Sequence, residues 1–266
     1  GAQLLLGYTF RVGEGTAAYN SMFNSLLVTN GGLVIRTSND ASLIGASSSS
    51  NVVKIVGGGT ASSSSVWSNN SYGLSIGSGV GSGNQLILDG NGVNGGAMLT
   101  NVGTINISGT SGNALIITNG GRLFGRSTIT VSGTNNYYKI DGGPASGTFV
   151  SNVAVVVGDA TGSNATISVA NATVLNSGAV TIGLGSSNNT ATVQAGGTWN
   201  LGGSTLTVGS GSATGNQFIM GGVGTASVQT ERLPHASSSG RDQVRGFQGI
   251  SSIPAAAFAA REAVNK

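Results

Sequence analysis

The chain has 266 residues, 47 of them glycine, with 7% charged residues and a net charge of +3. The charges are scattered and no basic patch is interleaved with aromatic residues, so we expect no nucleic-acid partner. The chain has no cysteine, which excludes disulfides and thiolate metal sites, and no apolar run approaches the length of a membrane-spanning helix.

The first segment of the chain, residues 1–8, is apolar around Leu4, Leu5 and Leu6. Such a segment is strand-prone, and an unpaired strand at the end of a sheet attracts another strand. We therefore expect this segment either to cover the first turn of the structure that follows or to pair with another subunit.

From about residue 9 to residue 228 the chain repeats one phrase, as in "FNSLLVTNGG" at 23–32 and "GNALIITNGG" at 112–121. An asparagine opens each copy, and apolar residues follow two and four places later, which is the alternation of a strand with one buried face. In the copy that opens with Asn164 the apolar residues are displaced by one place. The asparagines that we expect to hold the turns and to stack as a ladder are Asn24, Asn51, Asn84, Asn113, Asn136, Asn189 and Asn216.

Two more strands complete each repeat. One precedes the asparagine and usually ends in glycine, and a weaker one follows, as in "GRLF" at 121–124. Glycine and asparagine supply the positive φ that sharp corners need. Three short strands in about 27 residues predict one rung of a right-handed parallel β-helix, and stacked rungs bury what one rung cannot. We expect about eight rungs over residues 1–228. A β-sandwich gives no reason for the repeated asparagine, and propeller blades are longer.

Residues 229–266 form a different segment, with 8 of the 19 charged residues. The stretch 253–266, "IPAAAFAAREAVNK", predicts a short helix because proline suits a first helical position and alanine favours helix. We expect this tail either to cap the last rung or to dock on a neighbouring subunit, with Phe258 as a candidate contact.

The Gly-, Asn-, Ser- and Thr-rich repeats, such as "GSSNNTATVQAGGTWNLGGSTLTVG" at 185–209, resemble those of secreted, autotransporter-like passenger proteins of bacteria. The resemblance implies an extracellular β-solenoid on the bacterial surface. It implies no activity, because these repeats share no catalytic residues.

Chemistry on a β-helix that degrades polysaccharides needs clustered carboxylates on one face. Asp89 and Asp141 are predicted to share one column two rungs apart, with Thr118 between them, which is too wide for a retaining pair and marginal for an inverting one. Arg122, Arg126, Lys139 and Asp141 come from neighbouring rungs, and we interpret them as a solvated patch. Metal-ligand spacing is absent as well. We predict no enzyme, no catalytic residue, no metal and no cofactor.

The outward column three places after the asparagines carries large aliphatic residues between polar ones. A soluble monomer rarely exposes such a stripe, so either a loop or the tail covers it or another chain contacts it. Trp67 lies in the polar stretch 57–72 and is interpreted either as a contact for a partner or sugar or as packing on its own solenoid. The aliphatic members of the column are Leu27, Ile87, Ile116 and Ile219, and the polar ones are Lys54, Lys139, Thr166 and Thr192.

These features together predict an extracellular structural protein that self-associates, into a filament or a surface layer, through its open rung ends and the lateral stripe. The alternative is an adhesin or carbohydrate-binding surface protein whose partner is a cell-surface polysaccharide.

Overall fold

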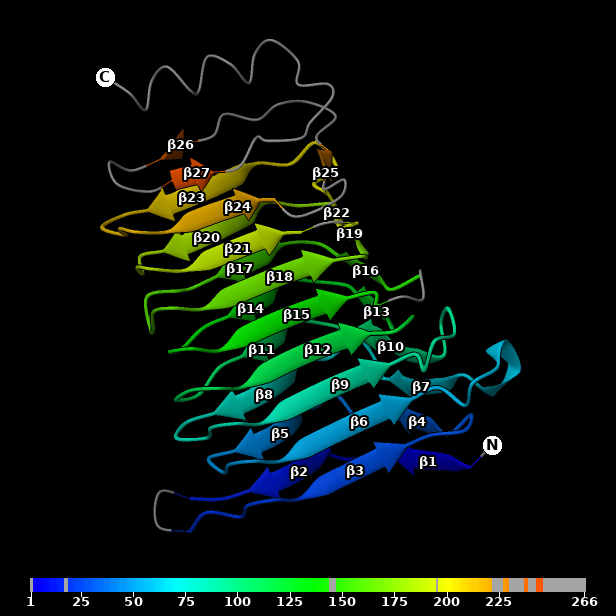
Figure 1. Ribbon diagram of the computed structural model, residues 1–266. Coiled ribbons are helices and arrows are strands. Elements are labelled where there is room, and N and C mark those ends of the chain that lie inside the picture. Colours follow the sequence, from blue (N-terminus) through cyan, green and yellow to red (C-terminus); the bar gives the residue numbers. More distant parts are fainter. Residues whose placement is uncertain are drawn as a thin grey trace, which may run out of the picture.

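The computed structural model describes residues 2–16, 19–143, 147–194 and 196–221, and the backbone of three strands at 227–229, 237–238 and 243–245. Within these residues the chain winds upward as a right-handed coil of short strands (Figure 1). Each rung of the coil contributes one strand to each of three parallel sheets, which we name A, B and C in the order in which the chain passes through them. The protein is therefore a β-solenoid, as predicted.

Within the described residues each sheet has nine strands, against the eight or so rungs predicted. Sheet A contains β1 (Gln3–Leu6), β4 (Leu33–Arg36), β7 (Ser65–Ser68), β10 (Ala97–Val102), β13 (Arg122–Gly125), β16 (Phe149–Asn152), β19 (Thr173–Asn176), β22 (Thr198–Asn200) and β25 (Ser227–Gln229). Sheet B contains β2 (Arg11–Glu14), β5 (Ser42–Ala46), β8 (Leu74–Ser78), β11 (Ile105–Ile107), β14 (Ile129–Val131), β17 (Val155–Val157), β20 (Val180–Leu184), β23 (Leu206–Ser210) and β26 (Ser237–Ser238). Sheet C contains β3 (Ser25–Val28), β6 (Val52–Val56), β9 (Gln85–Asp89), β12 (Ala114–Thr118), β15 (Tyr137–Asp141), β18 (Thr166–Ala170), β21 (Thr190–Val193), β24 (Gln217–Met220) and β27 (Gln243–Arg245).

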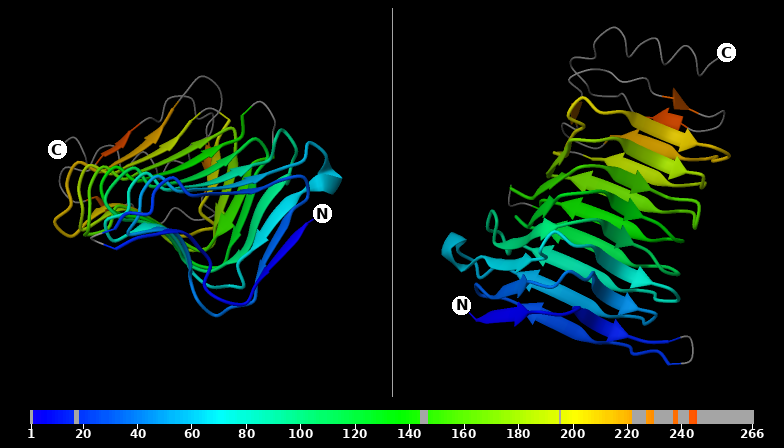
Figure 2. Two further views of the ribbon diagram at one scale, coloured as in Figure 1. Left: turned by 90° about the horizontal axis from the view of Figure 1, so that it is seen from below. Right: turned by 180° about the vertical axis from the view of Figure 1, so that it is seen from behind.

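The stack extends past the boundary predicted at residue 228. Strands β26 and β27 lie inside the segment 229–266 that was expected to be a tail, yet they pair in parallel with β23 and β24. The predicted helix at 253–266 lies outside the described residues. The two further views show the same stack from its N-terminal end and from behind (Figure 2).

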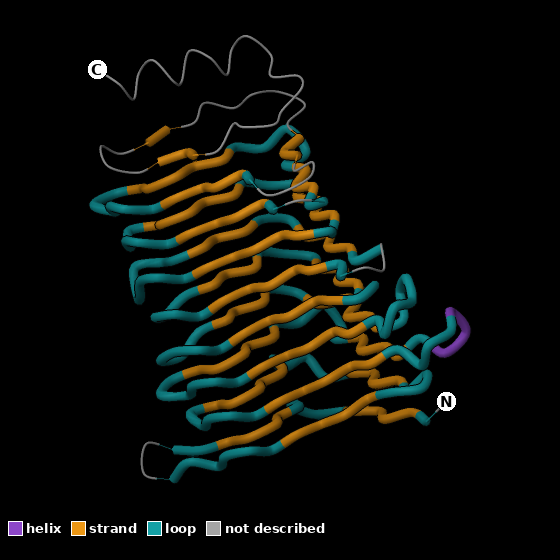
Figure 3. Tube along the Cα trace, viewed as in Figure 1, coloured by secondary structure: helices purple, strands orange, loops and turns teal. Residues whose placement is uncertain are grey.

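The corners between sheets C and A vary most in length. The connection from β6 to β7 contains a short 3₁₀ helix, η1 (Ala61–Ser63), drawn in purple at the edge of the stack (Figure 3). Long connections also follow β9 and β15, whereas three residues join β12 to β13. Insertions at a solenoid corner leave the stacking of the strands intact, because each strand pairs only with those of the neighbouring rungs.

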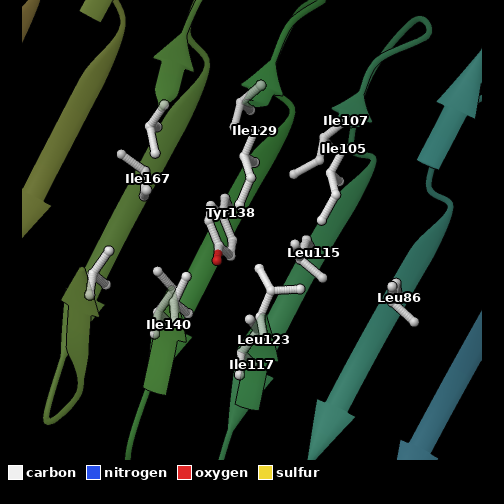
Figure 4. Close-up of a cluster of buried hydrophobic side chains, with 14 of the residues drawn as sticks. Leu86, Ile105, Ile107, Leu115, Ile117, Leu123, Ile129, Tyr138, Ile140 and Ile167 are labelled. Carbon is white, nitrogen blue, oxygen red and sulfur yellow. The ribbon is translucent and has the colours of Figure 1, made fainter. Parts of the chain in front are cut away.

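The inward residues of the three sheets stack into one continuous hydrophobic core. The alternation predicted from the sequence is confirmed, because Leu115 and Ile117 of β12 are fully buried and lie in register with Tyr138 and Ile140 of β15 (Figure 4). The Tyr138 hydroxyl is buried among these side chains with no hydrogen-bond partner among the described residues, and burial raises the pKa of Tyr138 well above its ordinary value near 10.0.

One charged side chain is buried in the described part of the chain, that of Arg36 at the end of β4. Its guanidinium donates to Ser42 Oγ at 2.8 Å, to Asn69 Oδ1 at 3.1 Å and to the Asp40 carbonyl at 2.7 Å. Burial lowers the pKa of Arg36, and the nearby Asp40 opposes that shift. These bonds join the A–B corners of the second and third rungs.

Candidate functional site

A ladder of asparagine side chains runs up the corner between sheets B and C. The backbone N–H and the side-chain Nδ2 of Asn51 both donate to Asn84 Oδ1, at 3.0 and 2.9 Å. The same two groups of Asn84 donate to Asn113 Oδ1, each at 2.9 Å. Asn24 is joined to Asn51, and Asn189 to Asn216, in the same way. The ladder therefore has a direction, with donors on one rung and the acceptor on the next rung toward the C-terminus.

Among the described ladder positions, one lacks its asparagine. The register pairs Tyr138 with Ile167, which places Ala165 above Asn136, and the Ala165 N–H donates to Asn189 Oδ1 at 2.9 Å. Asn164, which opens this copy of the repeat, lies one place before the ladder. The displacement of the apolar residues by one place in this copy of the repeat had indicated this shift. The same shift puts Ser168 of β18 in the outward column of sheet C. The prediction that Thr166 lies in that column is therefore wrong.

The positive φ at this corner belongs to the residue before the ladder position, and not to the ladder asparagine as predicted. Only glycine, asparagine and a few other residues tolerate this left-handed conformation well. In seven of the eight rungs that the structure describes at this corner the residue is small or polar, but in the first rung it is Phe23, at φ 59°. The other seven are Ser50, Gly83, Gly112, Asn135, Asn164, Asn188 and Gly215.

Exposed apolar side chains are concentrated on the first rung. Phe23 is 76% exposed, Leu5 is 65% exposed and Leu27 is 61% exposed. Seven of the eleven large hydrophobic side chains exposed in the described part of the chain lie between residues 4 and 27: Leu4, Leu5, Tyr8, Tyr19, Met22, Phe23 and Leu27. The other four are spread over later rungs as Tyr72, Val80, Val153 and Leu184.

The first rung also ends all three sheets. Each of β1, β2 and β3 pairs with one strand only, in the second rung, and no described strand lies on their other side. Alternate residues of a parallel strand direct their backbone groups to opposite neighbours. Because the Asn24 carbonyl accepts from Val52 in the second rung, Ser25 and Leu27 direct theirs away from the stack. We name β1, β2, β3 and the segments between them the N-terminal end.

Asn24 is the terminal member of the ladder at this end. Its Nδ2 donates to Asn51 Oδ1, Ser21 Oγ and the Met22 carbonyl. Its Oδ1 receives no hydrogen bond from the described residues, whereas that of every other asparagine in the ladder accepts from the preceding rung or, at Asn189, from Ala165. The ladder therefore stops at the N-terminal end with an unfilled acceptor.

The N-terminal leucines divide between the two faces of β1. Leu4 and Leu6 are in register with the buried Val34 and Arg36 and point inward, while Leu5 points outward. Leu4 is exposed because no described rung covers it from below. The segment therefore pairs with β4 and forms the first strand of the stack. Phe258, the candidate contact in the tail, lies outside the described residues.

The lateral stripe on sheet C is only partly exposed and is interrupted by charged residues. Ile87, Ile116 and Ile219 lie in one column with Leu27 but are half-buried by their neighbours. Lys54 and Lys139 interrupt the column and form ion pairs with Asp89 and Asp141, at 3.5 and 3.3 Å.

The interpretation of Trp67 as a contact for a partner or sugar is wrong. It lies on the inward face of β7, is 1% exposed and meets the ring of Phe10 edge-on, with ring centroids 5.1 Å apart. The polar insertion loops out before it, at 57–64, and the chain returns to the sheet at Ser65. The sequence placed Trp67 within the insertion because serines precede and follow the short apolar pair Val66 and Trp67.

The charged residues of the middle rungs pair locally. Asp89, Thr118 and Asp141 share one column, as predicted. Arg122 bonds to Asn94, and Arg126 donates to Ser71 Oγ at 3.0 Å, so the two arginines have separate partners. The described residues contain no group of three or more His, Cys, Asp or Glu side chains placed to hold a metal ion.

Comparison with protein-family models, with curated proteins and with solved structures finds no match to this chain. In the part of the chain that the structure describes, no helix has the length and apolarity needed to cross a membrane. The N-terminal end is proposed as the functional site from its geometry alone, because its exposed apolar side chains lie beside its unpaired strand edges.

Proposed function

We propose that the chain is an extracellular structural protein that self-associates through its N-terminal end, into a filament or a surface layer. The observation that carries the proposal is the concentration of exposed apolar side chains on the first rung, where each of the three strands has one edge with no described strand beside it. A strand edge of this kind pairs readily with another strand.

Phe23 supports a contact role for this end. A bulky side chain with positive φ costs on the order of 1 kcal/mol or more, and the other rungs avoid that cost with small or polar residues. Backbone strain of this kind clusters at functional sites. An exposed aromatic side chain is also the kind of anchor that dominates protein interfaces.

The magnitudes are consistent with association. Burying a large apolar side chain contributes about 1.5–3 kcal/mol, and association costs about 4–15 kcal/mol in lost freedom of motion. One or two exposed side chains would not offset that cost, whereas the seven on the N-terminal end do so if a partner covers most of them.

The extracellular location rests on the resemblance of the repeats to secreted passenger proteins. Antibody labelling of intact source cells, together with assay of the culture medium, tests it. Protein found only inside the cells contradicts the location but leaves the self-association intact.

The central experiment is sedimentation velocity over a wide range of protein concentration. We expect the wild type to sediment faster as concentration rises. The double variant Phe23→Asn with Leu5→Ser should associate at least about tenfold more weakly, because it removes two exposed apolar contacts. Asparagine already occupies the position of Phe23 in three later rungs, so the variant should fold.

The matched control is Leu184→Ser, which removes an exposed leucine far from the N-terminal end. It should associate as the wild type does. A wild type that stays monomeric at the highest concentrations overturns the proposal, and so does a control that weakens association as much as the double variant.

A further inference from the structure

We infer that the partner of the N-terminal end is the same surface of a second copy, so that two copies join head to head about a twofold axis that crosses β2. This inference rests on the proposed self-association and gives it a symmetry, in which the dimer is the unit of any filament or layer. It is carried by a charge pattern on β2 that is complementary to itself and by the places of the exposed aromatic side chains.

Two residues of β2 direct their backbone groups away from the stack. The Phe10 carbonyl accepts a hydrogen bond from the second rung at 2.9 Å, and the Gly15 N–H donates to the same rung at 2.8 Å. In a parallel ladder the residues that make such bonds flank those whose own groups point to the opposite side. Arg11 and Glu14 therefore direct their backbone groups to the open side of β2.

The side chains of these two residues carry opposite charges. They are the only charged side chains in the sequence from residue 1 to residue 28. Within one copy they form an ion pair and remain 42% and 53% exposed. A twofold axis that crosses β2 between Val12 and Gly13 sets the strand antiparallel to its copy and brings each Arg11 opposite the second copy's Glu14. Opposite charges placed in this way stabilise an antiparallel pair, whereas like charges destabilise it.

The same axis exchanges the two corners that flank β2. Tyr8 lies at the A–B corner before β2 and is 85% exposed, whereas Met22 and Phe23 lie at the B–C corner after it. The axis brings the Tyr8 of each copy to the corner that carries Phe23 in the other, so the contact is made twice in a dimer. Paired aromatic side chains contribute more than the area that they bury.

The axis also exchanges sheets A and C, so that β1 of one copy faces β3 of the other. Seen from the N-terminal end, the first strands lie along the three sides of the stack (Figure 2). The Leu6 carbonyl accepts from the second rung, so Leu5 directs its backbone groups to the open side, as Leu27 does in β3. Leu5 and Leu27 are also the outward side chains of these strands, 65% and 61% exposed. Antiparallel pairing of β1 with β3 sets them together on the outer face.

The symmetry of the contact decides the size of the first assembly. A contact that uses the N-terminal end of both copies is isologous and closes at the dimer. A contact between the N-terminal end and any other part of the chain leaves one N-terminal end free and continues to add copies. The distribution of oligomer masses therefore separates the two arrangements.

The first test is the mass distribution of the full chain, by mass photometry at rising concentration. We expect the dimer to be the first associated species, with any larger species at even multiples of the monomer. Trimers as abundant as dimers overturn the twofold arrangement while leaving self-association intact, and a monomer at every concentration overturns both.

The second test reverses one charge of β2 at a time. Arg11→Glu makes the strand acidic and Glu14→Arg makes it basic, so each variant meets like charges across the axis and should dimerise at least about tenfold more weakly. An equimolar mixture of the two variants should dimerise as the wild type does, because every acidic position then faces a basic one. A mixture that associates as weakly as its components overturns the twofold pairing of β2.

The matched control reverses the charges of the ion pair between Lys139 and Asp141 on sheet C, far from the N-terminal end. Lys139→Glu and Asp141→Lys change the net charge by the same amounts, and each should dimerise as the wild type does. Equal weakening by Lys139→Glu and Arg11→Glu overturns the role of Arg11, because net charge alone would then explain both. Trp67 and Trp199 are buried, so their fluorescence checks that each variant is folded.

A double-mutant cycle tests the aromatic contact. Tyr8 and Phe23 lie beyond opposite ends of β2 within one copy, so coupling between them should arise across the axis. We expect Tyr8→Ser and Phe23→Asn each to weaken dimerisation, and the double variant to weaken it at least about threefold less than the product of the two single effects. Effects that simply multiply overturn the placement of Tyr8 against Phe23.

Discussion

The first rung and the interior rungs use the same repeat for different purposes. At the corner between sheets B and C, an interior rung has a small or polar residue followed by a buried ladder residue, as in Gly83 and Asn84. The first rung has Phe23 and Asn24 at these two places, and both are exposed. The backbone conformation is the same, with φ 59° at Phe23 and 63° at Gly83. The repeat determines the conformation, and the place in the stack determines whether a residue belongs to the core or to the surface.

The same contrast holds along the inward columns. Val34 of β4 and Leu4 of β1 occupy equivalent positions, yet Val34 is buried and Leu4 is exposed. In a solenoid each rung is covered by its two neighbours, so a terminal rung lacks half of its cover. A self-associating protein uses that deficit, whereas a monomer must cap it.

The largest expected effect on stability comes from substituting one of two glycines that have nearly the same φ. Gly45 has φ 76°, and a Cβ added there would lie 2.0 Å from Asn84 Cγ. Gly92 has φ 77° with nothing within 4 Å. We expect Gly45→Ala to lower the free energy of unfolding by about 3 kcal/mol or more, from strain plus displacement of the ladder, and Gly92→Ala by about 1 kcal/mol.

Gly13 extends this comparison to the first rung. A Cβ there would lie 2.2 Å from Asn51 Cγ, but no described rung lies below to prevent the strand from shifting. The loss in free energy of unfolding for Gly13→Ala, measured by urea denaturation, should therefore lie between those of the other two variants. Equal losses for Gly45→Ala and Gly92→Ala would mean that the ladder tolerates displacement at no cost.

The second prediction compares a buried and a terminal asparagine. Asn84→Ala leaves the Asn51 N–H without a partner inside the stack, and it removes one hydrogen bond from Asn51 Nδ2 and one of the two that Asn113 Oδ1 accepts, so it should cost about 2–3 kcal/mol. Asn24→Ala in dilute, monomeric protein should cost less than about 1 kcal/mol, because water replaces the lost bonds. Urea denaturation followed by tryptophan fluorescence measures both. The contrast fails if the terminal variant loses as much as the interior one.

The third prediction concerns strain at the N-terminal end. Phe23→Asn should raise the stability of the monomer by about 1 kcal/mol, because asparagine tolerates positive φ better than phenylalanine. Ser50→Asn, at the same place in the second rung, should change stability less. Thermal unfolding of dilute protein checks both, and a Phe23→Asn monomer that is less stable than the wild type would show that Phe23 packs on its own chain.

The smallest expected effect concerns a buried hydroxyl in the interior of the stack. Tyr138→Phe removes a buried hydroxyl without a partner and should stabilise the protein by about 1 kcal/mol at neutral pH. The pKa of Tyr138 is raised in the folded state, so the folded protein keeps the phenol protonated where the unfolded chain ionises. The wild type should therefore lose stability as the pH rises above about 10, and the advantage of Tyr138→Phe should grow there. An advantage that stays constant above that pH would contradict the burial of the hydroxyl.

Sequence periodicity predicted most of the fold, because each rung repeats the same local pattern. The alternation of apolar residues, the corner glycines and the repeated asparagine all lie within one repeat and need no knowledge of the rest of the chain. The candidate site was harder to predict. Leu4, Leu5 and Leu27 were predicted as candidate contacts, whereas Phe23 was not, although it occupies the place before the asparagine where other copies have glycine, serine or asparagine.

The sequence by itself determined the solenoid, its period, and the columns of the three sheets, because strand alternation and corner chemistry are local. Only the tertiary structure decided which of two adjacent residues joins the ladder, since the register of β15 and β18 puts Ala165 there and not Asn164. It also decided that Trp67 is core, because the insertion before it returns the chain to sheet A in register. Burial depends on the neighbouring rungs, and an exposed end is defined by the absence of such a neighbour.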